Sequence, residues 1–228
     1  MKTLDDALLK YFKSATKVND DWYKWKIDVS KLPIGISISL PNGNDLKKNI
    51  FLKNALSKEF LKASDVNKVR IICYYISIWG GVRGNSCDNF MFYALDKTED
   101  IFKKRTSGIA SWSKALCIRN PNRYAIYDSR VAVALNALQI KSKIENPTLF
   151  PLVPGRGKGI KNSIPLIKQH AIDEGWPKQN ANDFYDEYNQ LISKVAKKCE
   201  VEHAKVEMLL FSKAMDLVKE AFPGQVLN

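Results

Sequence analysis

Residues 107–135 read Ser-Gly-Ile-Ala-Ser-Trp-Ser-Lys-Ala-Leu-Cys-Ile-Arg-Asn-Pro-Asn-Arg-Tyr-Ala-Ile-Tyr-Asp-Ser-Arg-Val-Ala-Val-Ala-Leu, and this stretch decides the fold. A short basic helix is expected over residues 99–104, and a second helix is expected to begin near Ser111, which suits an N-cap. Gly108 lies between them and can take the positive φ of a tight turn. The pattern therefore predicts a helix, a turn and a second helix.

The second half of the stretch predicts a third helix with an aspartate at its start. Residues 120–122, Asn-Pro-Asn, are a strong turn signal, and residues 124–127 are expected to be extended. Asp128 and Ser129 then suit the start of a helix. Its apolar positions recur at helical spacing, at Val131, Leu135 and Leu138.

This order of elements resembles the helix-hairpin-helix DNA glycosylase superfamily. Its members carry a hairpin of the form Leu-Pro-Gly-Val-Gly and, later, a Val-Asp-Thr-His-Val-type segment that holds a catalytic aspartate. Ser-Gly-Ile-Ala at 107–110 corresponds to the hairpin, and Ile-Tyr-Asp-Ser-Arg-Val at 126–131 corresponds to the aspartate segment. The closer likeness, over about residues 70–215, is to the 8-oxoguanine-glycosylase-like proteins of bacteria, some of which act in phage defence on modified bases.

The resemblance implies a mainly α, two-lobed helix-hairpin-helix glycosylase-like fold with a small N-terminal β element. It also implies an enzyme that flips out a damaged or modified base and hydrolyses its N-glycosidic bond. Breaking that bond develops positive charge on the deoxyribose, which a carboxylate stabilises. Asp128 occupies the position of the family's catalytic aspartate, although an aspartate at a helix start can also serve only as an N-cap.

Lys114 is the candidate for a second catalytic role. In bifunctional members of the superfamily, a lysine just after the hairpin attacks the sugar and forms a Schiff base. Counted from Gly108, that lysine falls nearer to Trp112 than to Lys114. Lys114 is therefore either a shifted nucleophile or a phosphate-binding or exposed lysine, and we expect a glycosylase with weak or no lyase activity.

Further candidates follow from the same resemblance. The N–H groups of the hairpin turn and helix start, at Gly108 and Ser111, are expected to bind a DNA phosphate. Arg130 is expected to pair either with Asp128 or with a phosphate. The candidates for the base pocket are Trp79, Trp112 and Tyr127.

Two glycine-rich stretches offer additional phosphate contacts. Residues 79–85, Trp-Gly-Gly-Val-Arg-Gly-Asn, form either a tight connection or a loop beside the base pocket from which Arg83 reaches a phosphate. Residues 154–161, Pro-Gly-Arg-Gly-Lys-Gly-Ile-Lys, lack the Gly-Lys-Ser/Thr ending of a nucleotide-binding loop. They form either a solvated loop or a phosphate-binding loop that uses Arg156 and Lys158.

The remainder of the chain is expected to be helical with one exception. Residues 22–40 alternate apolar and polar side chains, which predicts two strands. The sequence after position 146 contains many prolines and glycines, which predicts a long irregular connection. We divide the single glycosylase-like unit into residues 1–62 (helix, small sheet and helix), 63–140 (helical core with hairpin and aspartate) and 141–228 (basic loop and C-terminal helices).

Composition restricts the partners and the compartment. The chain has 36 basic and 24 acidic residues, a net charge of +12, which favours a polyanion such as double-stranded DNA. No apolar run is long enough for a membrane span. The four cysteines have no Cys-x-x-Cys spacing, and the two histidines make no metal site by themselves. We expect a cytoplasmic monomer with free thiols and without a metal or other cofactor.

Two other classes of function remain open. The same fold can serve as a non-catalytic module that binds modified or distorted DNA. A helical adaptor for other proteins, with an incidental basic surface, is the third reading.

Overall fold

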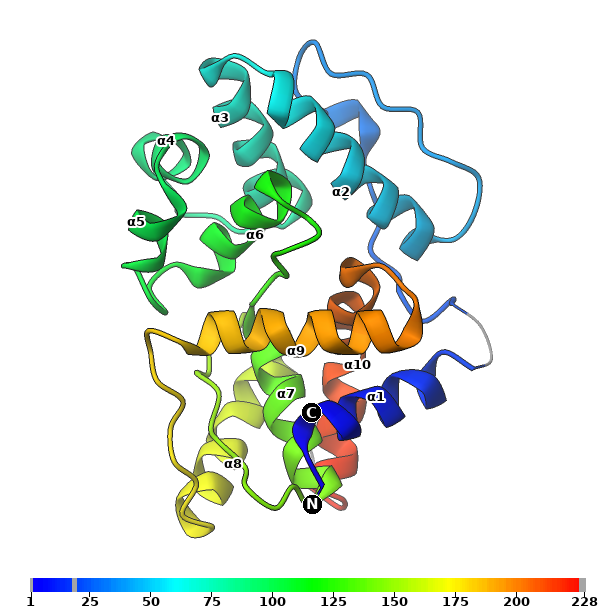
Figure 1. The fold of residues 1–228 in the computed structure, drawn as a ribbon, viewed down its shortest axis with the longest axis vertical. Coiled ribbons are helices and arrows are strands. Elements are labelled where there is room, and N and C mark those ends of the chain that lie inside the picture. Colours follow the sequence, from blue (N-terminus) through cyan, green and yellow to red (C-terminus); the bar gives the residue numbers. More distant parts are fainter. Residues whose placement is uncertain (1, 18–19, 226–228) are drawn as a thin grey trace. The chain divides into compact units, whose positions relative to one another are not determined.

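The structure is a computed structural model that describes residues 2–17 and 20–225, and it is mainly α-helical (Figure 1). Ten α-helices and no β-strand lie within these residues. The prediction of a mainly α protein is therefore confirmed. Within the same residues, no helix combines the length and the hydropathy needed to cross a membrane.

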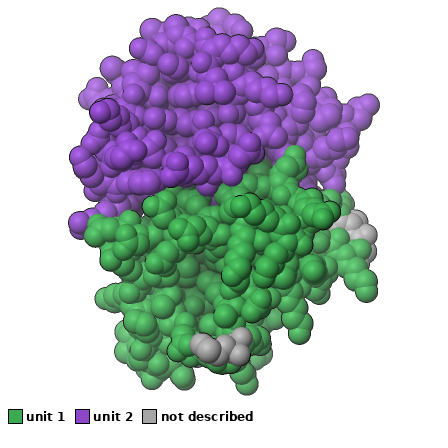
Figure 2. Space-filling model, in the orientation of Figure 1, with its two compact units in different colours: residues 1–22, 127–228 green, residues 23–126 purple. Residues whose placement is uncertain are grey.

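The chain separates into two compact units, which Figure 2 shows in different colours. Unit 1 comprises residues 1–22 and 127–228, and unit 2 comprises residues 23–126. These bounds differ from the three predicted segments, because the N-terminal helix belongs with the C-terminal half. The chain passes from unit 2 to unit 1 between Ile126 and Tyr127, just before Asp128.

Unit 2 is built around a buried helix, α6 (Ile109–Arg119), in which every residue from Ser111 to Ile118 is buried. It packs against α2, α3, α4 and η2, which completes a core made mostly of apolar side chains. The elements of this unit are η1 (Val29–Lys31), α2 (Asp45–Lys62), α3 (Asp65–Cys73), η2 (Tyr74–Trp79), α4 (Cys87–Leu95), α5 (Thr98–Phe102) and α6.

The predicted small N-terminal sheet is wrong for the residues that the structure describes. Residues 23–40 contain the 3-10 turn η1 and a second turn at residues 33–36, and they form no strand ladder. Their alternating pattern reflects one-sided contact instead: Ile36, Ile38 and Leu40 are half-buried, and the residues between them are exposed. An alternating pattern of apolar and polar residues indicates a segment with one face buried and the other exposed. It does not show that the segment pairs with another strand.

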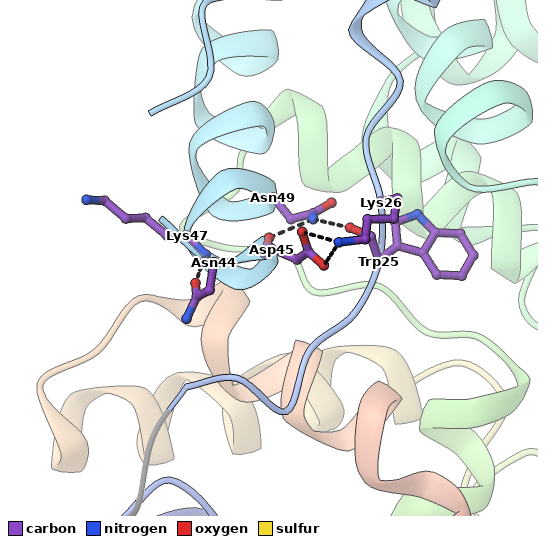
Figure 3. Close-up of polar contacts among 6 residues, drawn as sticks. All are labelled: Trp25, Lys26, Asn44, Asp45, Lys47 and Asn49. Atoms are coloured by element: carbon purple, nitrogen blue, oxygen red, sulfur yellow. Dashed lines mark hydrogen bonds and ion pairs between the residues drawn. The ribbon is translucent and has the colours of Figure 1, made fainter. Parts of the chain in front are cut away.

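A hydrogen-bond network around Asn49 holds this extended segment in place (Figure 3). The Asn49 amide is buried and donates to the backbone oxygens of Trp25 and Asp45, each at 2.7 Å. Its oxygen accepts the Trp79 indole N–H at 2.8 Å. The Trp25 indole in turn donates to the backbone oxygen of Trp79 at 3.0 Å. One side chain on α2 thereby joins the extended segment to η2.

The rim of this network is polar and exposed. Lys26 pairs with Asp45 at 2.9 Å, and the Lys26 side chain is 83% exposed. Asn44 caps α2 by accepting the N–H of Lys47 at 3.0 Å. The Asp45 side chain is only 13% exposed, but the Lys26 ammonium stays in water, so this pair contributes less to stability than a buried amide that satisfies three polar groups.

Unit 1 is built around a second buried helix, α7 (Ser129–Ser142), in which residues 131–139 are all buried. The longest helix of the unit, α10, packs along α7, and α1 and α8 also contact it. The other elements of this unit are α1 (Leu4–Ala15), α8 (Lys158–Asp173), α9 (Phe184–Cys199) and α10 (His203–Ala221).

Two buried amides on α7 fix the proline-rich connection that follows it. Asn136 exchanges two hydrogen bonds with the backbone of Phe150, at 3.0 and 3.1 Å. Gln139 does the same with Thr148, at 2.9 and 3.0 Å. The connection is shorter than predicted, because α8 begins at Lys158 and continues through Pro165.

All four cysteines are free thiols, as predicted, but only Cys117 is fully buried. Cys117 lies in α6, and its thiol donates to the backbone oxygen of Tyr124 at 3.1 Å. Cys87 is exposed at the start of α4. Burial raises the pKa of the Cys73 thiol, which keeps it protonated at neutral pH.

The Asn49 network makes a stability prediction. Asn49→Ala should lower the free energy of unfolding by about 2–3 kcal/mol, because it leaves the buried Trp79 indole and the Trp25 carbonyl without their partner. Lys26→Ala is the matched control from the exposed rim and should cost less than about 1 kcal/mol. Urea unfolding measures both. Equal effects of the two variants would contradict the importance given to the buried amide.

Candidate functional site

The predicted helix, turn and second helix are present in unit 2. α5 ends at Phe102, α6 begins at Ile109, and Gly108 before it has the predicted positive φ, +68°. Gly108 is also the N-cap, and its carbonyl accepts the N–H groups of Ser111 at 2.8 Å and Trp112 at 3.1 Å. Ser111 is therefore not the N-cap, because the left-handed glycine starts the helix three residues earlier. Its hydroxyl accepts the Asn85 amide at 3.0 Å.

The turn leaves three backbone N–H groups available. Those of Arg105, Ser107 and Ile109 are bonded to carbonyls of the turn. The N–H groups of Thr106, Gly108 and Ala110 have no acceptor in the part of the chain that the structure describes. Thr106 and Gly108 are also exposed. Unsatisfied amides at an exposed turn and helix start bind anions.

Arg105 has a backbone conformation that an arginine adopts only at a cost. Its φ is +50°, in the left-handed region. The other two described non-glycine residues with positive φ, Lys143 and Glu200, are helix C-caps, where this conformation is common. Arg105 instead lies in the exposed turn before Gly108. Strain at such a position suggests that the side chain is kept for function.

Lys114 is buried, so the exposed-lysine alternative is wrong. It is 4% exposed, and its ammonium donates to the backbone oxygen of Ala110 at 2.8 Å. Its aliphatic stem crosses Gly80: a Cβ at that position would lie 2.7 Å from Lys114 Cε. Gly80 directly follows η2, a π-helix, and donates to Tyr75 in the wider spacing of that helix. π-Helical segments occur often at functional sites.

The three aromatic candidates for the base pocket are buried in their own units. Trp79 stacks on Tyr75 with ring centroids 4.2 Å apart, and the Trp112 indole donates to the backbone oxygen of Ser107 at 3.1 Å. Tyr127 has no exposed surface, and its hydroxyl donates to the backbone oxygen of Pro151 at 2.8 Å. Burial, with the nearby Asp128 charge, holds the Tyr127 pKa well above its usual range. Their role in a pocket stays a prediction.

Asp128 is the N-cap of α7 in unit 1. Its Oδ1 accepts the N–H groups of Arg130 at 3.0 Å and Val131 at 3.1 Å. Its Oδ2 has no hydrogen bond to any residue that the structure describes, and the side chain is half-buried. The first turn of the helix therefore orients the carboxylate, while one oxygen stays available.

Arg130 does not pair with Asp128. Its guanidinium lies over the Phe211 ring, 5.0 Å from the centroid, and no ion pair joins it to Asp128 among the described residues. Only its backbone N–H contacts the Asp128 carboxylate. The predicted salt bridge between these residues is wrong, and the phosphate contact stays a prediction.

The basic glycine-rich loop packs against the helix that Asp128 caps. A Cβ on Gly155 would lie 2.7 Å from Ser129 Oγ and 2.6 Å from a methyl group of Ile160, so the backbone approaches the start of α7 closely. α8 then begins at Lys158 without a side-chain cap. Its first-turn N–H groups, at residues 158–160, have no acceptor within the described ranges. Arg156 and Lys158 are exposed beside them.

The structure thus collects the candidates into two groups. Arg83, Gly108, Ser111, Trp79, Trp112 and Lys114 lie in unit 2, whereas Asp128, Arg130, Tyr127, Arg156 and Lys158 lie in unit 1. Sequence reasoning missed Asn85, which bonds to Ser111, and it missed the π-helix before Gly80. The three closely spaced glycines at 80, 81 and 84 indicated a loop. Nothing in the sequence indicated that Asn85 would bond to Ser111.

Comparison with known proteins finds no match to this chain among family models, curated proteins or solved structures. The assignment of function therefore rests on the residues and their geometry.

The close approach of Gly155 makes a prediction about the Asp128 region. Gly155→Ala should lower the free energy of unfolding by about 1–3 kcal/mol, because the new methyl group meets Ser129 and Ile160. Gly157→Ala, two residues away, is the control: its Cβ meets nothing within 4 Å, so only the weaker N-cap preference changes, by up to about 1 kcal/mol. Thermal unfolding of both variants measures the difference, and equal losses would contradict the packing described.

The strain at Arg105 makes a second prediction. Arg105→Gly should raise the free energy of unfolding by about 1 kcal/mol, because glycine adopts the left-handed conformation freely. Lys143→Gly, at a left-handed helix C-cap, should give a similar gain. Affinity for duplex DNA should fall only for Arg105→Gly. A variant that is more stable and binds DNA as tightly as the wild type would show that the strain has no role in binding.

Proposed function

We propose that the protein is a DNA glycosylase that extrudes a damaged or modified base and hydrolyses its N-glycosidic bond, which leaves an abasic site. The observation that carries the proposal is Asp128: a carboxylate fixed by two backbone N–H groups, with one oxygen available, beside the basic loop that ends at Lys158. The resemblance of residues 126–131 to the family's aspartate segment supports the same assignment.

The chemistry requires a negative charge held close to the deoxyribose. As the base departs, positive charge grows on the sugar, and a carboxylate with a fixed orientation stabilises that charge without having to reorganise. Asp128 Oδ1 is held by the helix, so Oδ2 is the oxygen that can face the sugar or orient a water for attack. The bond from the sugar C1′ to the base nitrogen breaks and the water oxygen bonds to C1′, while the proton that the water loses is, in net terms, taken up by the departing base.

Each unit, taken by itself, has cations and amides that suit a phosphate of the DNA backbone. The uncapped first turn of α8, with Arg156 and Lys158, is suited to one phosphate near Asp128. The turn before α6, with Arg105 and three available N–H groups, is suited to another. Such contacts position the strand while the target nucleotide leaves the stack.

The bacterial branch that the sequence resembles suggests two settings for this reaction. One is repair of damaged bases in the cell's own DNA, and the other is defence against phage DNA that carries modified bases. We propose modified and oxidised bases as the substrate class for both settings.

A non-catalytic DNA-binding module is the second candidate. The observation that favours it is the packing of Trp79, Trp112 and Tyr127, whose rings are already occupied by protein partners. A protein that only detects distorted DNA needs the phosphate contacts and does not need Asp128.

Excision assays on a panel of duplexes distinguish the two. The panel contains 8-oxoguanine, uracil, alkylated bases, hydroxymethylcytosine and its glucosylated form, and alkali cleavage reports abasic sites. We expect excision of at least one base and a loss of at least about 100-fold in Asp128→Asn, because the variant keeps the cap but not the charge. Asp28→Asn, at the N-cap of η1, is the control and should keep full activity.

The same assay without alkali tests Lys114. We expect little strand cleavage, because its ammonium is buried and bonded to Ala110. Cleavage that is lost in Lys114→Met, which keeps the stem against Gly80, would instead identify a nucleophile. Tight binding to the duplexes without an abasic site in any of them would contradict the glycosylase proposal and support the non-catalytic DNA-binding module.

A further inference from the structure

The positive charge of the protein is concentrated in one unit. Unit 2 carries 18 basic and 8 acidic residues, a net charge of +10, whereas unit 1 carries 18 basic and 16 acidic residues, a net charge of +2. Unit 2 is also the smaller of the two. Within it, residues 101–126 contain six basic residues and no acidic one. The excess that favours a polyanion is therefore a property of unit 2 and not of the whole surface.

Ion pairs increase this asymmetry. Five of the eight acidic residues of unit 2 already pair with a lysine of the same unit, namely Asp28, Asp45, Glu59, Asp65 and Asp100. Arg83 and Arg105 are exposed and have no ion pair with any described residue. Their charges are thus available to an external anion.

The segments that carry these two arginines are joined. Asn85, two residues after Arg83, donates its amide to Ser111 in the first turn of α6. Gly108 and the turn that contains Arg105 lead directly into that same turn of the helix. Ser111 is 3% exposed and Asn85 is half-buried, while both arginines are exposed. One partly buried hydrogen bond therefore joins the two exposed basic segments.

We propose that unit 2 provides the main surface that grips the phosphate backbone of duplex DNA, and that Asn85 is a positioning residue that holds the Arg83 loop against the Arg105 turn. Unit 1 then supplies Asp128 and only the local contacts of Arg156 and Lys158. The inference rests on the proposed function for its choice of duplex DNA as the polyanion. It extends the proposed function by assigning DNA-backbone binding mainly to unit 2 and catalysis to unit 1.

The test compares salt-dependent binding of matched double variants to an unmodified duplex, in the Asp128→Asn background so that no excision occurs. One variant carries Arg83→Gln and Arg105→Gln in unit 2. The control carries Lys168→Gln and Lys219→Gln, two exposed lysines of unit 1 without an ion pair to a described residue. Fluorescence anisotropy from about 50 to 200 mM salt gives the affinity and its salt slope.

We expect the unit 2 variant to bind about tenfold or more weakly at 100 mM salt, with a salt slope lower by about 2, because two phosphate contacts are lost. The control should change the affinity less than twofold and leave the slope intact. Equal losses in the two variants would overturn the proposal, and so would unchanged binding in the unit 2 variant. Tighter binding to duplex RNA than to duplex DNA would also overturn it.

Asn85 is tested by Asn85→Ala in the same assay. A positioning role predicts about threefold to tenfold weaker binding in protein that stays folded, with only a small fall in melting temperature for the one hydrogen bond lost. Asn85→Gln, whose amide can still donate to Ser111, should recover part of the affinity. Wild-type affinity in Asn85→Ala would remove this residue from the proposal. Because no step requires excision, a failure of the glycosylase proposal leaves these binding results interpretable on their own.

Discussion

Buried polar groups on the central helices must find hydrogen-bond partners, and this constraint determines where the irregular segments of the protein lie. α6 and α7 are enclosed on nearly all sides, so a polar side chain on or near them loses water and has to be bonded within the protein. Some of these groups bond within their own helix, as Lys114 does to Ala110. Others bond to backbone groups of extended segments and loops, and each of those bonds fastens such a segment to a helix.

Two irregular segments are held in this way. Asn136 and Gln139 on α7 hold the chain at Thr148 and Phe150, which leads to the basic loop beside Asp128. Asn49 on α2 holds the extended segment at Trp25. In each case the helix provides a rigid base, and the segment bonded to it is held in a defined position. Loops on a rigid support are where binding residues are commonly found.

Glycines act together with these bonds because they permit the backbone to come close. Gly80 makes room for the stem of Lys114, and Gly155 makes room for Ser129. Both lie in loops that carry candidate DNA contacts, at Arg83 and Arg156. The division of charge adds a functional consequence, since unit 2 carries nearly all of the excess positive charge while Asp128 belongs to unit 1. Under the proposed function, DNA-backbone binding and catalysis would belong to different parts of one chain.

The sequence by itself determined the local features. It predicted the mainly helical fold, the left-handed Gly108 between two helices, and Asp128 at the start of α7, because turn residues, caps and apolar spacing act over a few neighbouring positions. Only the tertiary structure decided the partners. The segment at residues 23–40 found Asn49 instead of a second strand, Ser111 found Asn85 instead of serving as a cap, and Lys114 was buried against Gly80. These contacts join residues 24 to 34 positions apart, and no local pattern encodes which distant group will satisfy a buried amide or fill the space above a glycine.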